Sequence, residues 1–328
     1  MWVLLACVPT PEPVQWSYPL DDVLRVNHVQ SVGTHNSYHM RTDGIEVDAW
    51  NYEHAPLDVQ LEDQGVRQFE LDIWWDEAEG DFGVYHVPVI DSTSTCAWLS
   101  DCAEVLRAWS DANPAHHPFL TLLELKDEYD EETAPGVLDA IDDILGASWP
   151  ADRRISPDDV QRDAASLAEG LAAGGWPTLG EVRGQAIFVL HTGGDFRGAY
   201  TEGDTETAGR VMFPDGHGET DLAVGAIDTL NDPVGDAELI AAALAAGHLV
   251  RTRADSDGDQ ARSNDTAQRD AGLASGAHFL STDFPIPYAE TGYVVAMPGG
   301  TPSRCNPILA PAECTSEAIE DPRWIEGD

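Results

Sequence analysis

The segment FLTLLELKDEYDEETAPGVLDAIDDIL, residues 119–145, combines the two elements that decide the fold. Residues 119–125 are almost continuously apolar, as in a strand buried on both faces. After a short acidic connection, residues 134–145 place their apolar side chains at helical spacing. A buried strand followed by an amphipathic helix is the repeating unit of parallel α/β sheets.

The same alternation continues on both sides of this segment. Further strands are predicted at 25–32, 66–74, 81–86, 185–191, 248–255 and 278–284, with a weak one at either 211–213 or 223–227. Further helices are predicted at 102–110, 158–173, 237–246 and 264–275. Eight strands with intervening helices predict an α/β fold, a single-domain (β/α)8 barrel of the TIM type. We expect the barrel at 21–296 and an irregular wrap containing a cysteine pair at 297–328.

Composition excludes several functional classes. The chain has 328 residues, and its 59 acidic and 17 basic side chains give a net charge of −42. Such a charge repels the phosphate backbone, so no nucleic acid partner is expected. No run approaches 18 apolar residues, so we expect no membrane-spanning segment. Lys126 is the only lysine, which draws attention to its position.

The cysteines favour export from the cell. Cys96 and Cys102 form one close pair, Cys305 and Cys314 form another, and each pair is expected to close a short loop as a disulfide. Cys7 is left over, in an apolar leader within 1–20 where LLAC (4–7) resembles the lipobox of bacterial lipoproteins; a misplaced start codon or a stray apolar end is the alternative. We therefore expect a secreted protein or an outer-surface lipoprotein of a bacterium. Separately, we expect the protein to be a monomer.

Polar residues gather where the predicted strands end, which is the catalytic face of such a barrel. Side chains two apart on a strand share a face, so each pair or trio within one strand is expected to point inward together. These strand-end residues are His35, Asn36, Glu70, Asp72, His86, Glu124, Lys126, Arg251, Arg253, Asp255 and Asp283.

Three carboxylates and one amide oxygen form a ligand set made only of oxygen, from Glu70, Asp72, Glu124 and Asn36. Hard oxygen ligands suit Ca²⁺ or Mg²⁺ and do not suit zinc. The two histidines are then better used as acid–base and charge-stabilising groups than as ligands. Together with the cations opposite, these groups predict transfer chemistry at a phosphate diester. The alternative is that the carboxylates merely pair with buried arginines in the barrel core.

The motifs resemble the phosphoinositide-specific phospholipase C family, and most closely its bacterial calcium-dependent branch. They follow in the order GTHNSY (33–38), ELD (70–72), YH (85–86) and LELK (123–126). The resemblance runs from about residue 27 to 314 and includes PLDVQLEDQGVRQFELD (56–72), LRAWSDANP (106–114), LGEVRG (179–184) and RCNP (304–307).

The resemblance implies a role for each matching residue. His35 matches the histidine that stabilises the pentacovalent phosphorane, and His86 matches the general acid for the departing diacylglycerol oxygen. The inositol 2-hydroxyl attacks phosphorus to give the cyclic 1,2-phosphate. The implied calcium ligands are Asn36, Glu70, Asp72 and Glu124, with Glu70 or Glu124 as the base, and the implied substrate-binding residues are Lys126, Arg251 and Arg253.

One departure from the family bears on the substrate. Members that cleave polyphosphorylated inositides carry lysines at the end of the fifth strand, whereas this chain reads AIFVLHTGG (186–194). Phosphatidylinositol, presented at a membrane surface, is therefore the expected substrate. His191 occupies that position, and its role there is either to bind a hydroxyl of the inositol ring or purely structural. The loop 41–52, with Trp50 and Tyr52, is the candidate membrane contact.

Other functions remain open on sequence alone. A glycerophosphodiester phosphodiesterase uses a similar skeleton, but it resembles HRG at the first histidine, where this chain has His35-Asn36-Ser37. A phospholipase of the sphingomyelinase D type is a more distant possibility. A catalytically inactive surface lipoprotein that binds calcium or inositol would not need His86 as well as His35.

Overall fold

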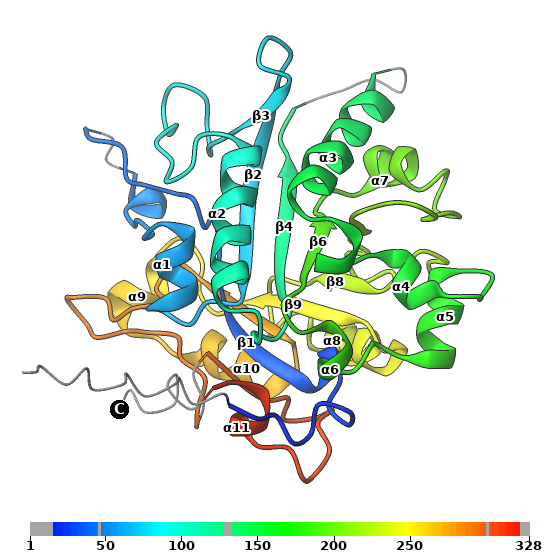
Figure 1. Ribbon diagram of the computed structural model, residues 1–328. Helices are drawn as coiled ribbons and strands as arrows, with labels where there is room; N and C mark the ends of the chain where they lie inside the picture. The colour runs from blue at the N-terminus through cyan, green and yellow to red at the C-terminus, as the bar shows by residue number, and fades with distance from the viewer. Residues whose placement is uncertain (1–15, 45–46, 128–132, 300–301, 322–328) are drawn as a thin grey trace, which may run out of the picture.

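Parallel strands form the centre of the molecule and helices surround them (Figure 1). The computed structural model describes residues 16–44, 47–127, 133–299 and 302–321. The barrel strands are β1 (Val29–Thr34), β2 (Gln68–Asp76), β4 (Phe119–Leu125), β6 (Ala186–Leu190), β7 (Phe213–Pro214), β8 (Ile227–Thr229), β9 (Leu249–Arg253) and β10 (Phe279–Thr282). Each pairs in parallel with the next, β10 returns to β1, and a single bridge between Asp215 and Ile227 joins β7 to β8. The predicted barrel is confirmed.

The identity of two barrel strands differs from the prediction. The segment predicted at 81–86 forms β3 (Asp81–Val84), which pairs antiparallel with β2 as a hairpin outside the barrel. Both weak candidates instead supply strands, β7 and β8. The strand expected at 25–32 begins only at Val29, because a 3₁₀ turn occupies Val26–His28. Two short strands complete the sheet, β5 (Arg154–Ile155) beside β6 and β11 (Ser303–Cys305) antiparallel to β1.

The helices fill the connections between strands. They are α1 (Leu57–Glu62), α2 (Leu99–Ala112), α3 (Ala134–Ser148), α4 (Pro157–Gln161), α5 (Leu167–Gly174), α6 (Leu179–Val182), α7 (Gly194–Tyr200), α8 (Ala237–Ala246), α9 (Asp259–Ser263), α10 (Ala267–Ser275) and α11 (Ser316–Ile319), with 3₁₀ turns at Asp48–Trp50 and Ala151–Arg153. None of the helices in the described ranges is both long and apolar enough to cross a membrane.

The helix predicted at 158–173 is in fact two, α4 and α5. Arg162 takes a φ of 54°, which ends α4, and Ser166 starts α5 by accepting a hydrogen bond from the backbone N–H of Glu169 at 3.2 Å. The two helices then touch at Gly170, where a Cβ atom would lie 2.4 Å from the carbonyl oxygen of Gln161. A residue larger than glycine would force them apart.

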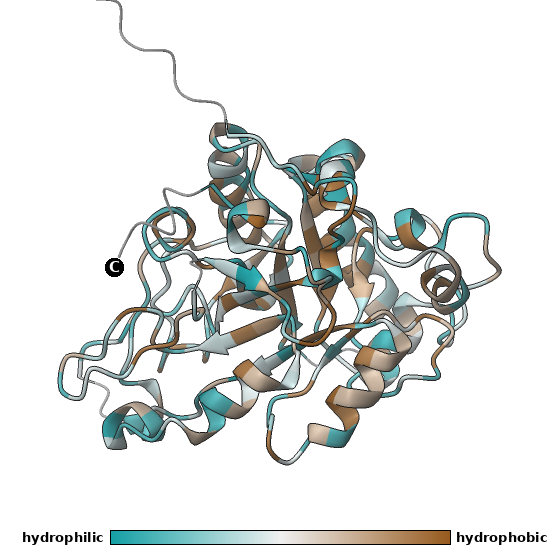
Figure 2. Cartoon of the chain, turned by 90° about the horizontal axis from the view of Figure 1, so that it is seen from below, coloured by the Kyte–Doolittle hydropathy of each residue, from teal (hydrophilic) through white to brown (hydrophobic). Residues whose placement is uncertain are grey.

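Alternation along β4 explains both the core and the site. Phe119 and Leu123 face outward and pack with the residues of α2 and α3, whereas Leu120 and Leu122 face the barrel interior. Glu124 continues the inward series at the carboxyl end of the strand. Apolar residues, brown in Figure 2, concentrate on the central strands and on the helix faces turned toward them. The barrel interior is therefore apolar along the strands and polar at their carboxyl ends, which form the mouth of the barrel.

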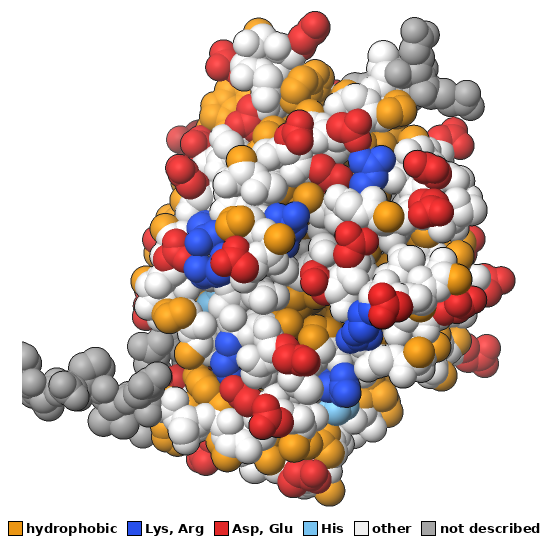
Figure 3. Space-filling model, turned by 45° about the vertical axis from the view of Figure 1, so that its right-hand side comes forward, with side chains coloured by type: hydrophobic (Ala, Val, Ile, Leu, Met, Phe, Trp, Pro, Cys, Tyr) orange, Lys and Arg blue, Asp and Glu red, His pale blue; other side chains and the backbone are white. Residues whose placement is uncertain are grey.

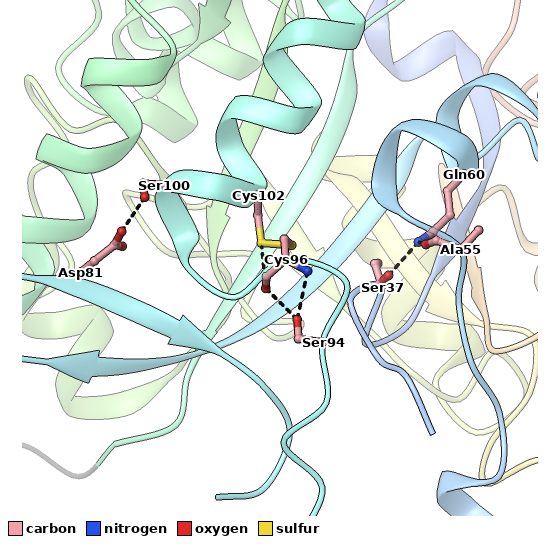
Figure 4. The surroundings of a disulfide bond; sticks show 8 residues. All are labelled: Ser37, Ala55, Gln60, Asp81, Ser94, Cys96, Ser100 and Cys102. Carbon is pink, nitrogen blue, oxygen red and sulfur yellow. Dashed lines mark hydrogen bonds between the residues drawn. A yellow bond between two sulfur atoms is a disulfide. The ribbon is translucent and has the colours of Figure 1, made fainter. Parts of the chain in front are cut away.

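The tail after β10 is fastened to the barrel at its amino-terminal end. Cys305 and Cys314 form a disulfide there, and a second disulfide joins Cys96 to Cys102 where α2 begins (Figure 4). Both pairings predicted from the cysteine spacing are confirmed. Acidic side chains are spread over the face seen in Figure 3, in keeping with the net charge of −42.

Candidate active site

Neighbouring strands place the carboxylates of Asp72 and Glu124 side by side. The two residues are register partners on β2 and β4. Lys126 follows two positions later, and its Nζ lies 3.1 Å from Asp72 Oδ2 and 2.8 Å from Glu124 Oε1. The only lysine of the chain thus partly neutralises two of the three predicted ligand carboxylates.

Glu70 lies one pleat deeper on β2 and pairs with Arg251 of β9. Arg251 is buried, and it also donates to Asn231 and, at 3.1 Å, to Ser281 Oγ. Burial alone would raise the pKa of Glu70, but the charge of Arg251 outweighs it and lowers that pKa. Glu70 is therefore an ionised carboxylate at neutral pH.

The donor set fits a divalent cation. Glu70, Glu124 and His191 each offer a donor atom, and the three atoms lie within 4.8 Å of one another. Neither carboxylate oxygen of the buried Asp72 has a hydrogen-bond partner of normal geometry among the described residues, although Lys126 forms an ion pair with it. Burial and the charge of Glu124 raise the pKa of Asp72 to about 8. A cation held between such carboxylates would relieve their repulsion and satisfy the unpaired oxygens.

Asp72, another predicted ligand, lies outside the group formed by Glu70, Glu124 and His191. Asn36 directly follows His35 at the end of β1, is buried, and takes a φ of 45°. Its side chain interacts with the hydroxyl of Tyr52. Because three of the four predicted ligands provide oxygen from carboxylates, the set still matches the preference of Ca²⁺.

His35 is held in place by a buried aspartate. Its Nδ1 lies 2.9 Å from Oδ1 of Asp283, at the end of β10, and Arg253 of β9 lies 3.4 Å from the other oxygen of Asp283. Burial and the charge of Arg253 hold the pKa of His35 well below its ordinary value. With Nδ1 engaged by Asp283, Nε2 is the ring nitrogen left for a ligand.

His86 is held in the same manner by a different aspartate. Its Nδ1 lies 2.9 Å from Oδ2 of Asp91, which also accepts from Nε2 of His39 at 3.0 Å. A bridge between Val87 and Asp91 closes the turn that brings Asp91 back to the histidine. Both predicted histidines therefore belong to histidine–aspartate pairs.

Aromatic rings connect the two pairs along one wall. Ring centroids are 6.4 Å apart for His35 and Tyr52, 4.5 Å for Tyr52 and His39, and 6.5 Å for His39 and His86. The expectation that Tyr52 contacts a membrane is wrong, because that side chain is buried in this wall. Trp50 is half-buried and packs edge-on against His86 at 5.2 Å.

A pocket of about 580 Å³ opens beside this wall. Its lining includes Tyr52 and His54, together with Asp283, Phe284, Ile286 and other residues of the segment after β10. Its volume is typical of small-molecule sites, and its mixture of apolar and hydrogen-bonding groups suits an amphiphilic ligand.

Two functional candidates, Asp91 and Asp215, escaped the sequence analysis, and a third, Asp283, was found there without its role. Asp91 lies in a loop five residues after His86, without a strand to suggest its direction. Asp283 was visible only as one of many strand-end residues, and pairing with His35 required the β1–β10 register. Asp215 is the partner of His191, at 2.6 Å, and follows a two-residue strand that has no strong sequence signal.

The comparisons with known proteins are decisive for the family. The sequence model for calcium-dependent phosphoinositide phospholipase C matches residues 24–84 and 81–307. The chain belongs to this family. The matched regions include both histidine–aspartate pairs and all the predicted ligands, and the resemblance predicted from the motifs is confirmed. No curated protein matches this phospholipase C family member in sequence.

Solved structures from bacteria share the fold of this phospholipase C family member. A calcium-dependent phosphoinositol-specific phospholipase C from Pseudomonas sp. is 20% identical, with a TM-score of 0.62 over 88% of this chain and 97% of that one. A calcium-dependent phosphatidylinositol-specific enzyme from Streptomyces antibioticus is 18% identical, with a TM-score of 0.58 over 80% and 96%. The Pseudomonas enzyme has also been solved as a myo-inositol complex, at 21% identity.

Proposed function

We propose that the protein is a calcium-dependent phospholipase C that cleaves phosphatidylinositol to diacylglycerol and inositol 1,2-cyclic phosphate. The observation that carries the proposal is the pair of imidazoles, His35 and His86, each oriented by a buried aspartate beside a set of carboxylates. Binding alone would not require two imidazoles held with their free nitrogens available.

In this proposal Asn36, Glu70, Asp72 and Glu124 hold the calcium ion. Calcium, when bound, supplies a Lewis acid that lowers the pKa of the inositol 2-hydroxyl. A carboxylate of the set, Glu70 or Glu124, accepts the proton of that hydroxyl. The hydroxyl oxygen then forms a bond to phosphorus while the bond from phosphorus to the diacylglycerol oxygen breaks.

The histidines act on the two sides of that exchange. His35, fixed through Nδ1 by Asp283, directs Nε2 to the phosphoryl oxygens, and in its protonated form, with Arg253 nearby, it stabilises the charge that develops on them. His86, fixed through Nδ1 by Asp91, delivers a proton from Nε2 to the departing diacylglycerol oxygen. Lys126 and Arg251 complete the cationic lining toward the phosphate and headgroup.

The headgroup proposed is inositol without further phosphates. Residues 186–194 contain no lysine, and the end of β6 presents His191 paired with Asp215 instead. The solved myo-inositol complex of the Pseudomonas enzyme supports an unphosphorylated ring as the ligand. A polyphosphorylated headgroup would lack local compensation in a chain with a net charge of −42.

Contact with the membrane is proposed through an apolar rim around the mouth of the barrel. Among the residues that the structure describes, six of the nine exposed large apolar side chains lie on loops at this end, and they are Met40, Val47, Val89, Ile90, Val234 and Ile286. Val89 is 91% exposed and takes a φ of 68°, which is unfavourable for a β-branched residue. Apolar insertion suits an acidic protein, since electrostatic attraction to an anionic surface is not available.

Export is proposed from the disulfides. Two disulfides in one chain are typical of oxidising compartments, and each closes a short loop. Cys7, the proposed lipid attachment site, lies outside the described residues. Mass measurement of the protein from its native cells, without reductant, tests both parts: free thiols at the paired cysteines would contradict export, and an unmodified Cys7 would contradict lipidation.

The activity is tested with phosphatidylinositol vesicles in calcium and in excess chelator, with the products identified by ³¹P NMR. We expect cyclic phosphate in calcium only. His86→Ala should abolish turnover while calcium binding persists, and His28→Asn, at the opposite end of the barrel, should leave turnover unchanged. Cleavage that ignores the chelator would refute the proposal, and cleavage of glycerophosphocholine instead would favour a glycerophosphodiester phosphodiesterase.

The apolar rim is tested separately. Replacing Val89 and Ile90 with Asp should weaken sedimentation with zwitterionic vesicles containing phosphatidylinositol, while turnover of a soluble short-chain substrate persists. Ile308→Asp, a change at a residue 58% exposed on the tail, is the matched control. Equal vesicle binding by all three proteins would remove the rim from the proposal.

A further inference from the structure

A second group of metal-ligating side chains lies in the turn PDGHG (214–218) that follows β7. Asp215 is fully buried, and its Oδ1 accepts from the backbone N–H groups of His217 and Thr229, both at 2.9 Å. Its other oxygen, Oδ2, is directed at two imidazoles. It lies 2.6 Å from His191 Nδ1 and 3.7 Å from His217 Nδ1.

The fold brings the imidazoles of His191 and His217 close together. His191 directly follows β6, where its backbone N–H donates to the carbonyl of Leu123 at 2.9 Å. His217 takes a φ of 48°, and its ring centroid lies 5.4 Å from that of His191. Gly193 leaves room for this arrangement, since a Cβ there would come within 3.2 Å of the His217 ring.

The distances suit a small divalent ion with nitrogen and oxygen ligands. The three donor atoms lie within 4.8 Å of one another. Ligands at the usual Zn–N and Zn–O lengths stand about 3.3 Å apart around a tetrahedral ion, between the 2.6 Å and 3.7 Å seen for Asp215 with its two histidines. Imidazole nitrogens select zinc-like ions over Ca²⁺, which prefers oxygen.

We propose that His191, Asp215 and His217 bind a transition-metal ion of the Zn²⁺ class, as a site separate from the calcium site of the proposed function. The side chain of His217 is 36% exposed, which leaves an entry path and a coordination position for water. Binding displaces the hydrogen shared between His191 and Asp215, and that proton passes to solvent. The inference does not depend on the lipase activity.

His191 also lies in the group formed with Glu70 and Glu124, so a single ion on that side is the competing arrangement. His217 distinguishes the two arrangements, because it belongs only to the group with His191 and Asp215. The variant His217→Asn removes the imidazole and keeps a residue that tolerates positive φ. His28→Asn removes an imidazole at the opposite end of the barrel, beside the 3₁₀ turn, and is the matched control.

The test titrates Zn²⁺, and Co²⁺ as a spectroscopic probe, into the full chain saturated with Ca²⁺. We expect one ion bound, visible Co²⁺ absorption bands, and an affinity that falls at least about tenfold in His217→Asn and is unchanged in His28→Asn. Circular dichroism checks that both variants are folded. The proposal is overturned if the native chain binds no such ion, if His217→Asn binds equally well, or if each Zn²⁺ bound releases one Ca²⁺.

Discussion

Glu320 is predicted to be the strongest single attachment of the C-terminal tail to the barrel. It follows α11 and is buried, with Oε1 lying 3.1 Å from Arg67 Nε and 2.9 Å from His117 Nε2. Arg67 stands at the start of β2 and His117 just before β4. Glu320→Gln keeps the size of the side chain and removes the negative charge that faces the buried Arg67.

The magnitude follows from the pKa of Glu320. Burial would raise this pKa, but the charges of Arg67 and His117 prevail and lower it from 4.5 to about 2. That difference corresponds to about 3 kcal/mol of the free energy of unfolding at neutral pH. Because the pKa is lower in the folded state, the contribution is complete above pH 4.5 and is lost as the pH falls toward 2.

The assay is urea denaturation of the native chain and Glu320→Gln across this pH range. We expect a difference of about 3 kcal/mol at neutral pH that shrinks toward zero in acid. Other buried groups that resist protonation and do not face Glu320, such as His278 with a pKa lowered to about 3 by burial, affect both proteins alike and cancel. The exposed Glu317 on α11 supplies the control Glu317→Gln. Equal stability of the two variants, or a difference that does not shrink in acid, would refute the reasoning.

Three further predictions concern the site and the tail. Glu124→Gln should weaken Ca²⁺ binding at least about tenfold by calorimetry, and an unchanged titration would remove Glu124 from the ligand set. Asp91→Asn should lower kcat for phosphatidylinositol at least about 100-fold and alter its pH profile, because His86 loses its orienting partner; a native profile would contradict this role. Replacing Cys305 and Cys314 with Ser should cost about 2–3 kcal/mol, since the bond closes a loop with a sequence separation of 9. Activity at moderate temperature should survive that change, and unaltered stability in urea would show that the loop needs no covalent closure.

The inward direction of the site residues was predictable because strand parity is a strict rule. Glu70 and Asp72 share a face with one another, and so do Arg251 and Arg253, in any strand that contains them. The alternation of side chains does not depend on where a strand begins. The start of β1 at Val29, later than predicted, therefore does not change which of its residues face inward. What parity cannot provide is which strands are neighbours, and the His35–Asp283 pair depends on that adjacency.

The error at 81–86 has a physical signal in the sequence. Only 77–80 separate β2 from β3, whereas a parallel crossover needs about a dozen residues. A hairpin was therefore the only connection possible, and that hairpin carries His86 to the mouth of the barrel. A second error was to expect a strand at either 211–213 or 223–227, when both regions supply one. The strands there, β7 and β8, have only two and three residues, and such short segments carry little β-strand propensity. Their position is set by the barrel and not by local preference.

The few cationic side chains of this acidic protein balance the carboxylates at the mouth of the barrel. Lys126, Arg251 and Arg253 all lie at the mouth of the barrel, and each is paired with a carboxylate there. Such pairing is needed for folding, because several ionised carboxylates brought together without it would repel one another. In the proposed function, a calcium ion entering the set would take over part of that compensation and weaken the ion pairs between the carboxylates and the cations. The cations would then be available to the phosphate diester, so the proposal gives these cations two roles, in balancing the acidic site and in binding an anionic substrate.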